Sequence, residues 1–332
     1  MTIPSTETGP MTAETVALAY RLLLGREPEN AEVVNDLAHA VHSTTQLRDV
    51  FLTAPEFRNQ MAALLERPDA VQQRHPFHFP AIPVEADVTD ELLARMLART
   101  QSQWEQLGRS DPYWSVITQP HYRKEQFEDY RQQFELSGKH SCELFLAALR
   151  RNGINPGSLR TCLEVGCGVG RVTRYLAQAV QQVIGCDISS QHLDLARQYL
   201  DSKAVANVEL RHWSSIEAIS QLPLFDALYS VITLQHNPPP VMAWMLRRLL
   251  GSLAPGGIAY FQLATYRNGY LFEAERYLNT PALPTLEMHV LPQAQVFRIV
   301  QEAGCACLEV REDTMCGDES RMLSNTFLVR KI

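Results

Sequence analysis

The chain of 332 residues is predicted to be an α/β protein preceded by an all-α N-terminal domain. Up to about residue 155, most apolar residues recur at helical spacing. From residue 161 onward, short apolar or β-branched runs alternate with helix-like stretches. A glycine-rich segment, LEVGCGVGRVT at 163–173, follows the first of these runs. Strand–helix alternation predicts a doubly wound, largely parallel sheet with helices on both faces.

Composition narrows the class of protein. The chain is 45% hydrophobic and 20% charged, which is typical of soluble globular proteins. Its net charge of -7 argues against a nucleic acid or an anionic membrane as the main partner. We expect no transmembrane segment, since no apolar run is long enough, and no secretory signal. The seven cysteines have no metal-site spacing, so we expect reduced thiols, a cytoplasmic location and no metal.

Residues 1–66 are predicted to form a small helical domain. Val16 and Tyr20 belong to a helical stripe that Gly25 and the following proline end. Residues 67–86 hold four prolines among polar residues, which predicts an extended linker.

Residues 87–155 are predicted to be a helical lead-in that covers the catalytic domain. The stripe begins at Leu93 and continues through Trp104. Two prolines interrupt it, and helices are expected to resume at about 125–136 and 140–152. Residues 156–332 form the α/β domain, with strands expected at 161–165, 182–186, 207–211, 225–234, 257–263, 305–310 and 326–331.

The glycine-rich turn predicts a ligand site. In open parallel sheets, ligands bind beyond the carboxyl ends of the strands, where glycines let the backbone approach them. Gly166 and Gly168 fit the first two glycines of a dinucleotide fingerprint, but Arg171 replaces the third. The pattern is instead E-x-G-x-G-x-G from Glu164. Asp187 ends the second predicted strand, where a carboxylate can bind both ribose hydroxyls.

Four segments in order, LEVGCGVGRVT, GCDIS, FDALYSVITLQHNPP and LAPGGIAYFQL, resemble the class I S-adenosylmethionine-dependent methyltransferases over roughly 160–332. The resemblance implies a Rossmann-like sheet, mostly parallel with an antiparallel last strand, and S-adenosyl-L-methionine as cofactor. The sequence departs from the family after the third strand, where Trp and Ser replace a frequent acidic residue. The cofactor-binding residues implied are Glu164, Gly166, Cys167, Gly168, Gly170, Asp187, Ile188, Trp213, Ser214, Leu234 and Gln235.

The same resemblance places the loop after the fourth strand beside the reacting sulfonium. A hydroxyl acceptor must lose its proton, and a histidine suits that task, so His236 is the predicted catalytic base. The alternative is a loop histidine that only forms hydrogen bonds. Asn237 is expected to cap the next helix. Arg171 either binds an acidic substrate or the cofactor carboxylate, or braces neighbouring helices.

Aromatic residues outside the sheet suggest an acceptor site. Side chains that pair an apolar ring with a polar group suit a sugar or another flat acceptor. The alternative for the aromatic cluster is ordinary core packing, and for the histidine an exposed or capping position. The predicted substrate residues are Tyr113, Trp114, Tyr122, Arg123 and His289.

The segments AYRLLLGREPENAE and LRDVFLTAPEFR, within roughly 13–62, resemble a helical domain of unknown function. That domain is often fused to bacterial surface-polysaccharide enzymes. The resemblance implies a glycan acceptor and partner enzymes of polysaccharide assembly. Three hypotheses stay open: O-methylation of a sugar or glycolipid intermediate, N- or C-methylation of a small metabolite, and a non-catalytic cofactor-binding assembly module.

Overall fold

The computed structural model describes residues 11–57, 80–282, 286–317 and 322–332. The chain divides into two compact units, residues 1–74 and residues 75–332. No helix within the described ranges is long and apolar enough to cross a membrane. The predicted boundary at residue 66 and the linker residues 67–79 lie outside the described residues.

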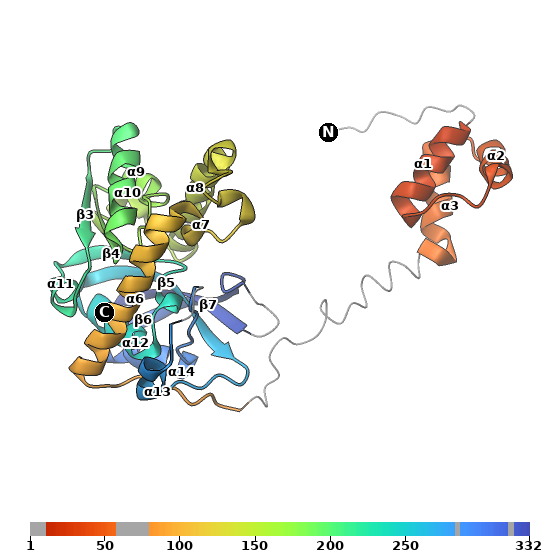
Figure 1. The fold of residues 1–332 in the computed structure, drawn as a ribbon. Coiled ribbons are helices and arrows are strands. Elements are labelled where there is room, and N and C mark those ends of the chain that lie inside the picture. Colours follow the sequence, from red (N-terminus) through yellow and green to blue (C-terminus); the bar gives the residue numbers. More distant parts are fainter. Residues whose placement is uncertain (1–10, 58–79, 283–285, 318–321) are drawn as a thin grey trace. The chain divides into compact units, whose positions relative to one another are not determined.

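The N-terminal unit contains α1 (Ala13–Leu24), α2 (Ala31–Ala40) and α3 (Thr44–Thr53), shown in red and orange in Figure 1. Each helix begins at a polar residue whose side chain accepts a backbone N–H, and Thr12 does this for α1. Tyr20 packs edge-on against Phe51, with ring centroids 4.9 Å apart. These helices therefore share a small hydrophobic core of their own.

The second unit is built on one sheet. Among the described residues, its seven strands have the order β3-β2-β1-β4-β5-β7-β6. All neighbouring pairs from β3 to β5 are parallel, whereas β7 is antiparallel to both β5 and β6. The predicted mostly parallel sheet with an antiparallel last strand is confirmed. The strands are β1 (Thr161–Val165), β2 (Gln182–Asp187), β3 (Val208–His212), β4 (Phe225–Ser230), β5 (Leu253–Arg267), β6 (Cys305–Asp313) and β7 (Met322–Lys331).

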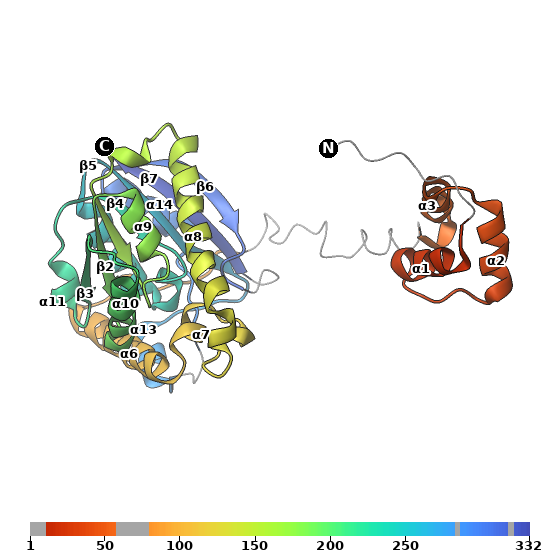
Figure 2. The same ribbon diagram turned by 90° about the horizontal axis from the view of Figure 1, so that it is seen from above.

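Helices cover both faces of this sheet (Figures 1 and 2). One hydrophobic cluster joins α8 and α9 to the sheet, and a second joins α6, α12 and α14 to its other face. Adjacent residues of β1 divide between them, because Cys162 faces the first cluster and Leu163 the second. The helices are α6 (Asp90–Ser110), α7 (Pro112–Val116), α8 (Phe127–Arg151), α9 (Thr173–Ala179), α10 (Ser190–Ser202), α11 (Ile216–Ser220), α12 (Pro239–Gly251), α13 (Ala274–Asn279) and α14 (Gln293–Glu302), with short 3-10 turns η1 (Pro120–Tyr122), η2 (Pro156–Ser158) and η3 (Leu234–His236).

Several predicted boundaries differ from the structure, and two of the differences have a clear cause in the chain's course. The fifth, sixth and seventh strands are longer than expected. The two helices expected at 125–136 and 140–152 are one continuous helix, α8. Gly138, which lies in the expected break, is a close-contact position, since a Cβ there would lie 2.1 Å from the carbonyl oxygen of Arg171. The fourth strand ends at Ser230 rather than at residue 234, because the chain turns into η3.

The end of the predicted linker packs on the sheet domain. Val84 pairs with Phe272 as an isolated parallel bridge, and the N–H of Phe272 donates to the carbonyl of Pro83. Ala86 is buried in the main core. Residues 80–86 therefore form part of the second unit.

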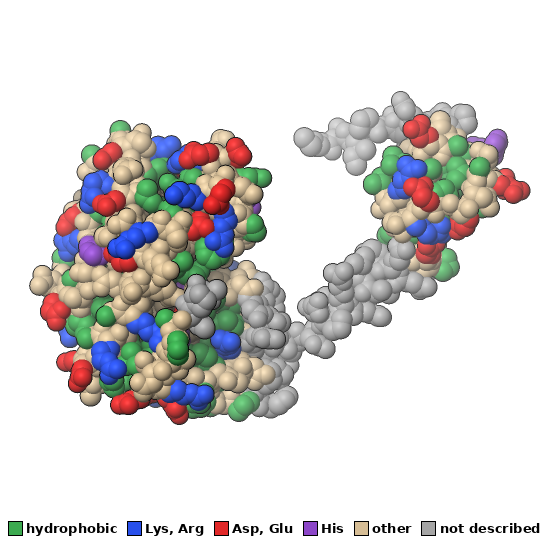
Figure 3. Space-filling view, viewed as in Figure 1, with side chains coloured by type: hydrophobic (Ala, Val, Ile, Leu, Met, Phe, Trp, Pro, Cys, Tyr) green, Lys and Arg blue, Asp and Glu red, His purple; other side chains and the backbone are tan. Residues whose placement is uncertain are grey.

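On the face of the second unit seen in Figure 3, acidic and basic side chains are interspersed. Mixed charges of this kind are typical of a solvated surface. The charge of that face points to no particular partner.

Candidate active site

The glycine-rich turn joins β1 to the segment before α9. Gly166 has a φ of +77°, and a Cβ on it would lie 2.1 Å from the Thr233 hydroxyl oxygen in the loop after β4. Only glycine fits this left-handed, crowded position. The N–H groups of Gly166 and Cys167 both donate to the carbonyl of Cys186, at 2.8 and 3.0 Å. These two N–H groups, which we expected to bind a ligand, instead fasten the turn to β2.

Asp187 is buried at the end of β2 and supports the same turn. Its Oδ2 accepts the N–H of Gly168 at 2.8 Å, and its Oδ1 accepts the N–H of Ser189 at 2.9 Å. Ser189 is also the N-cap of α10. Each carboxylate oxygen keeps a second lone pair. Asp187 can therefore bind hydroxyl groups of a ligand while it holds the turn.

A cavity opens beyond the carboxyl ends of β1, β2 and β4, with an empty volume of about 980 Å³ that includes open solvent. The cavity lies where parallel sheets bind ligands. Of the predicted cofactor residues, it is lined by Glu164, Gly166, Cys167, Gly168, Asp187, Ile188 and Trp213.

Glu164 is the buried acid of the cavity wall. Its side chain is 2% exposed, and its Oε2 has no hydrogen-bond partner among the described residues. Burial raises the pKa of Glu164 to about 7. An acid with one unpartnered carboxylate oxygen in this position is suited to a cationic ligand group.

Four predicted cofactor residues lie away from the cavity lining. Ser214 is exposed, and Leu234 is a fully buried core residue. The side-chain amide of Gln235 bonds to Gln262 and to the Met315 carbonyl instead. Gly170 faces α10, where a Cβ would lie 3.4 Å from Ala196.

The aromatic segment reaches the cavity through residues other than those predicted. Tyr113 stacks on Phe127 with ring centroids 3.5 Å apart, inside a cluster that also buries Tyr122. The Arg123 guanidinium lies 3.6 Å from the ring centroid of Trp114 and bonds to Asp111 at 2.7 Å. None of these four predicted substrate residues lines the cavity. Tyr113 and Tyr122 pack against aromatic rings of α8, whereas Arg123 lies over Trp114.

The sequence analysis did not predict several of the residues that line the cavity. Ser115 and Val116 lie between the predicted aromatics and face the cavity instead. Thr100 and Trp104 belong to the apolar stripe of α6. The stripe predicted that these residues are buried, but not that they border a cavity. His192 of α10 is buried, with its Nε2 2.9 Å from the Ser115 hydroxyl, and no motif pointed to it.

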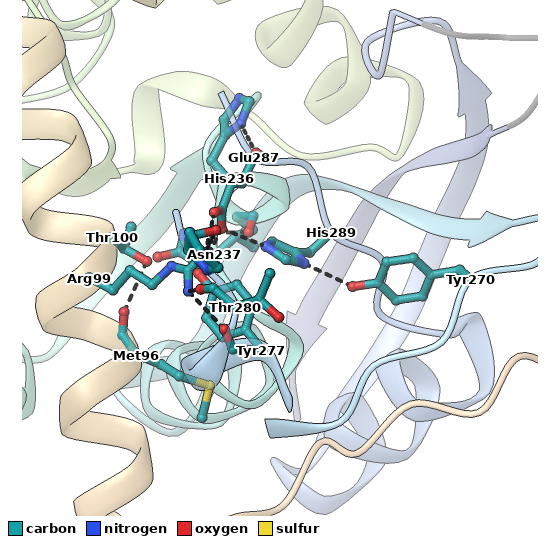
Figure 4. Close-up of polar contacts among 12 residues, drawn as sticks. Met96, Arg99, Thr100, His236, Asn237, Tyr270, Tyr277, Thr280, Glu287 and His289 are labelled. Carbon is teal, nitrogen blue, oxygen red and sulfur yellow. Dashed lines mark hydrogen bonds and ion pairs between the residues drawn. The ribbon is translucent and has the colours of Figure 1, made fainter. Parts of the chain in front are cut away.

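The two predicted histidines lie in a neighbouring polar cluster, shown in Figure 4. The hydroxyl of Tyr270 contacts His289 Nδ1 at 2.9 Å, and His289 Nε2 lies 3.3 Å from Glu287 Oε2. Arg99 of α6 forms an ion pair with Glu287 at 2.8 Å, and Tyr277 donates to the same carboxylate at 2.7 Å. Although burial acts to raise it, these hydrogen bonds hold the pKa of Glu287 at about 2. The cluster ties α6 to α13 and to the segment before α14, so His289 has a structural position.

His236 is buried beside this cluster and does not line the cavity. Its Nδ1 lies 2.9 Å from the Glu287 carbonyl oxygen, and its ring packs edge-on against Trp104 with centroids 5.4 Å apart. Burial lowers the pKa of His236 to about 4. The imidazole is therefore neutral at pH 7 and a weak base. Asn237, expected to cap α12, instead donates to the Thr233 carbonyl behind it.

The loop after β4 contains a strained residue at the cavity. Ile232 has a φ of +55°, which is unfavourable for a β-branched side chain. Its N–H donates to Gln262 Oε1 at 2.8 Å, and Gln262 Nε2 donates to Gln235 and Ser324. A buried amide network therefore holds this loop in place. Backbone strain of this kind is concentrated at functional sites.

Comparison with known proteins assigns the central part of this unit. Residues 162–257 match the family described as "Methyltransferase domain". The matched segment runs from β1 into β5 and carries the glycine-rich turn, Asp187 and the loop after β4. It covers less than a third of the chain, and it supplies most of the residues that line the cavity.

Individual relatives agree with this match. The ubiquinone biosynthesis O-methyltransferase of Acinetobacter baylyi is 31% identical over 113 residues, which are 33% of this chain and 46% of the relative. The trans-aconitate 2-methyltransferase of Methylobacterium radiotolerans is 34% identical over 106 residues, which are 31% of this chain and 38% of the relative. The chain spans about half the length of the curated relatives it matches, or less.

A solved structure agrees with the fold. A magnesium protoporphyrin IX methyltransferase from Synechocystis PCC 6803, with bound S-adenosylhomocysteine, aligns with a TM-score of 0.50 and 19% identity. The alignment covers 71% of this chain and all of that one. The strand order and the antiparallel β7 are those of class I methyltransferases. The second unit therefore has the class I methyltransferase fold, and residues 162–257 within it match a methyltransferase domain.

The residues that line the cavity fit S-adenosylmethionine as a cofactor. Asp187 keeps lone pairs that can accept ligand hydroxyl groups, and Trp213 and Ile188 give the cavity apolar surface on which a flat ring can pack. The unpartnered Glu164 Oε2 suits the ammonium of the methionine half. Gly168 has a φ of +53°, and a Cβ on it would lie 3.0 Å from the Val116 side chain across the cavity wall, so glycine keeps the turn close to α7.

Proposed function

We propose that the chain transfers a methyl group from S-adenosyl-L-methionine to an oxygen atom of a small molecule. The observation that carries this proposal is the cavity at the carboxyl ends of β1, β2 and β4, walled by the segment that matches methyltransferases. Both relatives named above are methyltransferases of small molecules by name, and one is an O-methyltransferase.

The work of the protein in this reaction is to align two reactants and to exclude water. The cofactor, when bound, supplies an electrophilic methyl group for an in-line displacement. Asp187 and the glycine-rich turn hold it, while Thr100 and Trp104 of α6 cover the cavity. The loop around Ile232 is held by buried hydrogen bonds, so it presents a fixed surface to the acceptor. Alignment of this kind accounts for much of the rate gain in bimolecular reactions.

For the acceptor, we propose a hydroxyl of a sugar or of a glycolipid or polysaccharide intermediate, modified in the cytoplasm. The support is the resemblance of the N-terminal segment to domains fused to surface-polysaccharide enzymes, which is an argument by association. On this proposal, the N-terminal unit binds such an enzyme or its glycan.

A radiolabel transfer assay tests the function. The full chain is incubated with methyl-labelled S-adenosylmethionine and with panels of nucleotide sugars, phenols, carboxylic acids and amines. We expect labelled product from the sugar panel, and none with Asp187→Ala at the same cofactor concentration. Label transfer only to another panel would retain the methyltransferase and reject the sugar acceptor.

An amine acceptor is the second candidate, and one observation favours it. His236, the predicted base, lies outside the cavity lining and has a pKa of about 4. A neutral amine needs no base before it attacks. If His236 serves as the base for a hydroxyl, His236→Ala lowers kcat by about a hundredfold or more with cofactor affinity unchanged. A change of only a few fold favours the amine.

A further inference from the structure

Arg171 places a positive charge at the cavity, and no carboxylate of the described residues lies within ion-pair distance of it. Its Nη1 donates to the hydroxyls of Ser137 and Ser141, at 3.1 and 3.3 Å, and its guanidinium lies 5.9 Å from the ring centroid of Phe134. Among the described residues it forms no ion pair within 4.0 Å, and its buried Nε has no hydrogen-bond partner. Burial lowers the pKa of Arg171, although the group stays cationic.

The fold holds this side chain in place. Gly138 lets α8 pack directly on the backbone of Arg171, where any Cβ would clash with the carbonyl at 2.1 Å. Ser137 and Ser141 flank that contact on α8, one turn apart, and both hydroxyls reach the guanidinium. Arg171 is therefore fixed by packing on one side while it lines the cavity on the other.

A second charge of opposite sign lies on the same cavity wall. Glu164 also lines the cavity, and it too has a buried atom without a partner, Oε2. The two side chains attract each other, and each shifts the pKa of the other toward its charged form, but they form no ion pair within 4.0 Å. A buried charge without a partner is costly, and two neutral hydroxyls compensate a guanidinium only in part. An α-amino acid group, with one ammonium and one carboxylate, complements this pair.

We propose that Arg171 binds the carboxylate of the methionine half of S-adenosylmethionine, an inference that rests on the proposed function. A guanidinium matches a carboxylate in shape and charge, which a hydroxyl donor does not. A brace between α8 and the turn would need only the hydrogen bonds to the two serines. It would not need a charged group at the cavity surface.

Calorimetric titration with two ligands tests this role. S-Adenosylhomocysteine carries the carboxylate, whereas its decarboxylated analogue keeps the adenosine, the sulfur and the ammonium. We expect the intact chain to bind S-adenosylhomocysteine about tenfold or more tighter than the analogue, a difference of roughly 1.4 kcal/mol. In Arg171→Met this preference falls to about onefold. Arg171→Lys keeps the charge and part of the preference, and it serves if the methionine variant does not fold.

Arg174→Met is the matched control. Arg174 lies one helical turn further along, pairs with Glu135 at 3.3 Å and does not line the cavity, so the variant keeps the full preference. A preference that persists in Arg171→Met, or equal weakening of both ligands, overturns the role of Arg171 and leaves the proposed function standing. If the intact chain binds neither ligand, the proposed function itself fails.

Discussion

Glu164 is the residue whose protonation a bound cofactor is expected to change. Burial raises its pKa to about 7, so close to half of these carboxyl groups are protonated at pH 7 in the free protein. An ammonium beside Oε2 favours the charged form and lowers that pKa. Binding therefore releases a proton, and protonation competes with binding below pH 7.

We predict that the affinity for S-adenosylhomocysteine falls as the pH is lowered from 7.5 to 6, approaching tenfold per pH unit below the pKa. Calorimetry in two buffers of different ionisation enthalpy measures the proton released. Glu164→Gln cannot titrate, so its affinity is lower at pH 7.5 and independent of pH over this range. If the affinity of Glu164→Gln falls with pH as steeply as that of the unaltered chain, the pH dependence belongs to another group.

Ile232 provides a second test at a single residue. Its φ of +55° stores strain on the order of 1 kcal/mol, which glycine would relieve. We predict that Ile232→Gly leaves the free energy of unfolding unchanged or raises it slightly. Val231→Gly, next in the chain and without positive φ, should lower it by about 1 kcal/mol or more. Chemical denaturation measures both, and equal losses would contradict the strain.

Some site residues could be predicted from the sequence because local spacing determines them. Glu164 and Asp187 end adjacent parallel strands, so alternation alone brings them to one edge of the sheet. The acceptor residues could not be predicted in this way. Tyr113 and Ser115 are two positions apart on a short helix, and only packing against α8 decides which of them faces the cavity.

At the scale of elements, α8 shows where local signals mislead. Two helices were expected at 125–136 and 140–152, and Ser137 and Gly138, residue types common in turns, lie in the gap between them. The helix instead continues through Gly138, and the missing side chain there lets α8 contact the turn after β1. The strands of the sheet were easier to predict, since buried parallel strands are short apolar runs with clear ends.

A substitution that adds one methyl group tests the close contact between α8 and the turn after β1. We predict that Gly138→Ala lowers the free energy of unfolding by about 1–3 kcal/mol and weakens cofactor binding, because its Cβ displaces Arg171. Gly251→Ala in α12 meets no atom within 4 Å, so it should be neutral or slightly stabilising. Thermal unfolding and calorimetry measure the two effects. Identical behaviour of the two variants would contradict the close approach.

At the scale of the whole molecule, the cavity belongs to one unit. Every residue that lines it lies within residues 75–332. The division into a helical region and an α/β region was visible in the sequence because helical periodicity gives way to strand–helix alternation. The identity of the methyl acceptor was not visible in the sequence, because the surface that would bind it is built from many elements.

This division predicts that residues 75–332, expressed alone, bind S-adenosylhomocysteine with an affinity within about threefold of the full chain. Calorimetry on both proteins makes the comparison. Loss of binding in a fragment that keeps its circular dichroism spectrum would mean that the N-terminal unit contributes to the cofactor site.

The central claim is that the cavity binds S-adenosylmethionine, and calorimetric titration of the full chain tests it most directly. We predict micromolar binding of S-adenosylmethionine and S-adenosylhomocysteine, weakened about tenfold or more in Asp187→Ala, which is roughly 1.4 kcal/mol. Asp194→Ala, on the exposed side of α10, should bind as the unaltered chain does. Absence of binding, or equal affinity in Asp187→Ala, would contradict the assignment of the site.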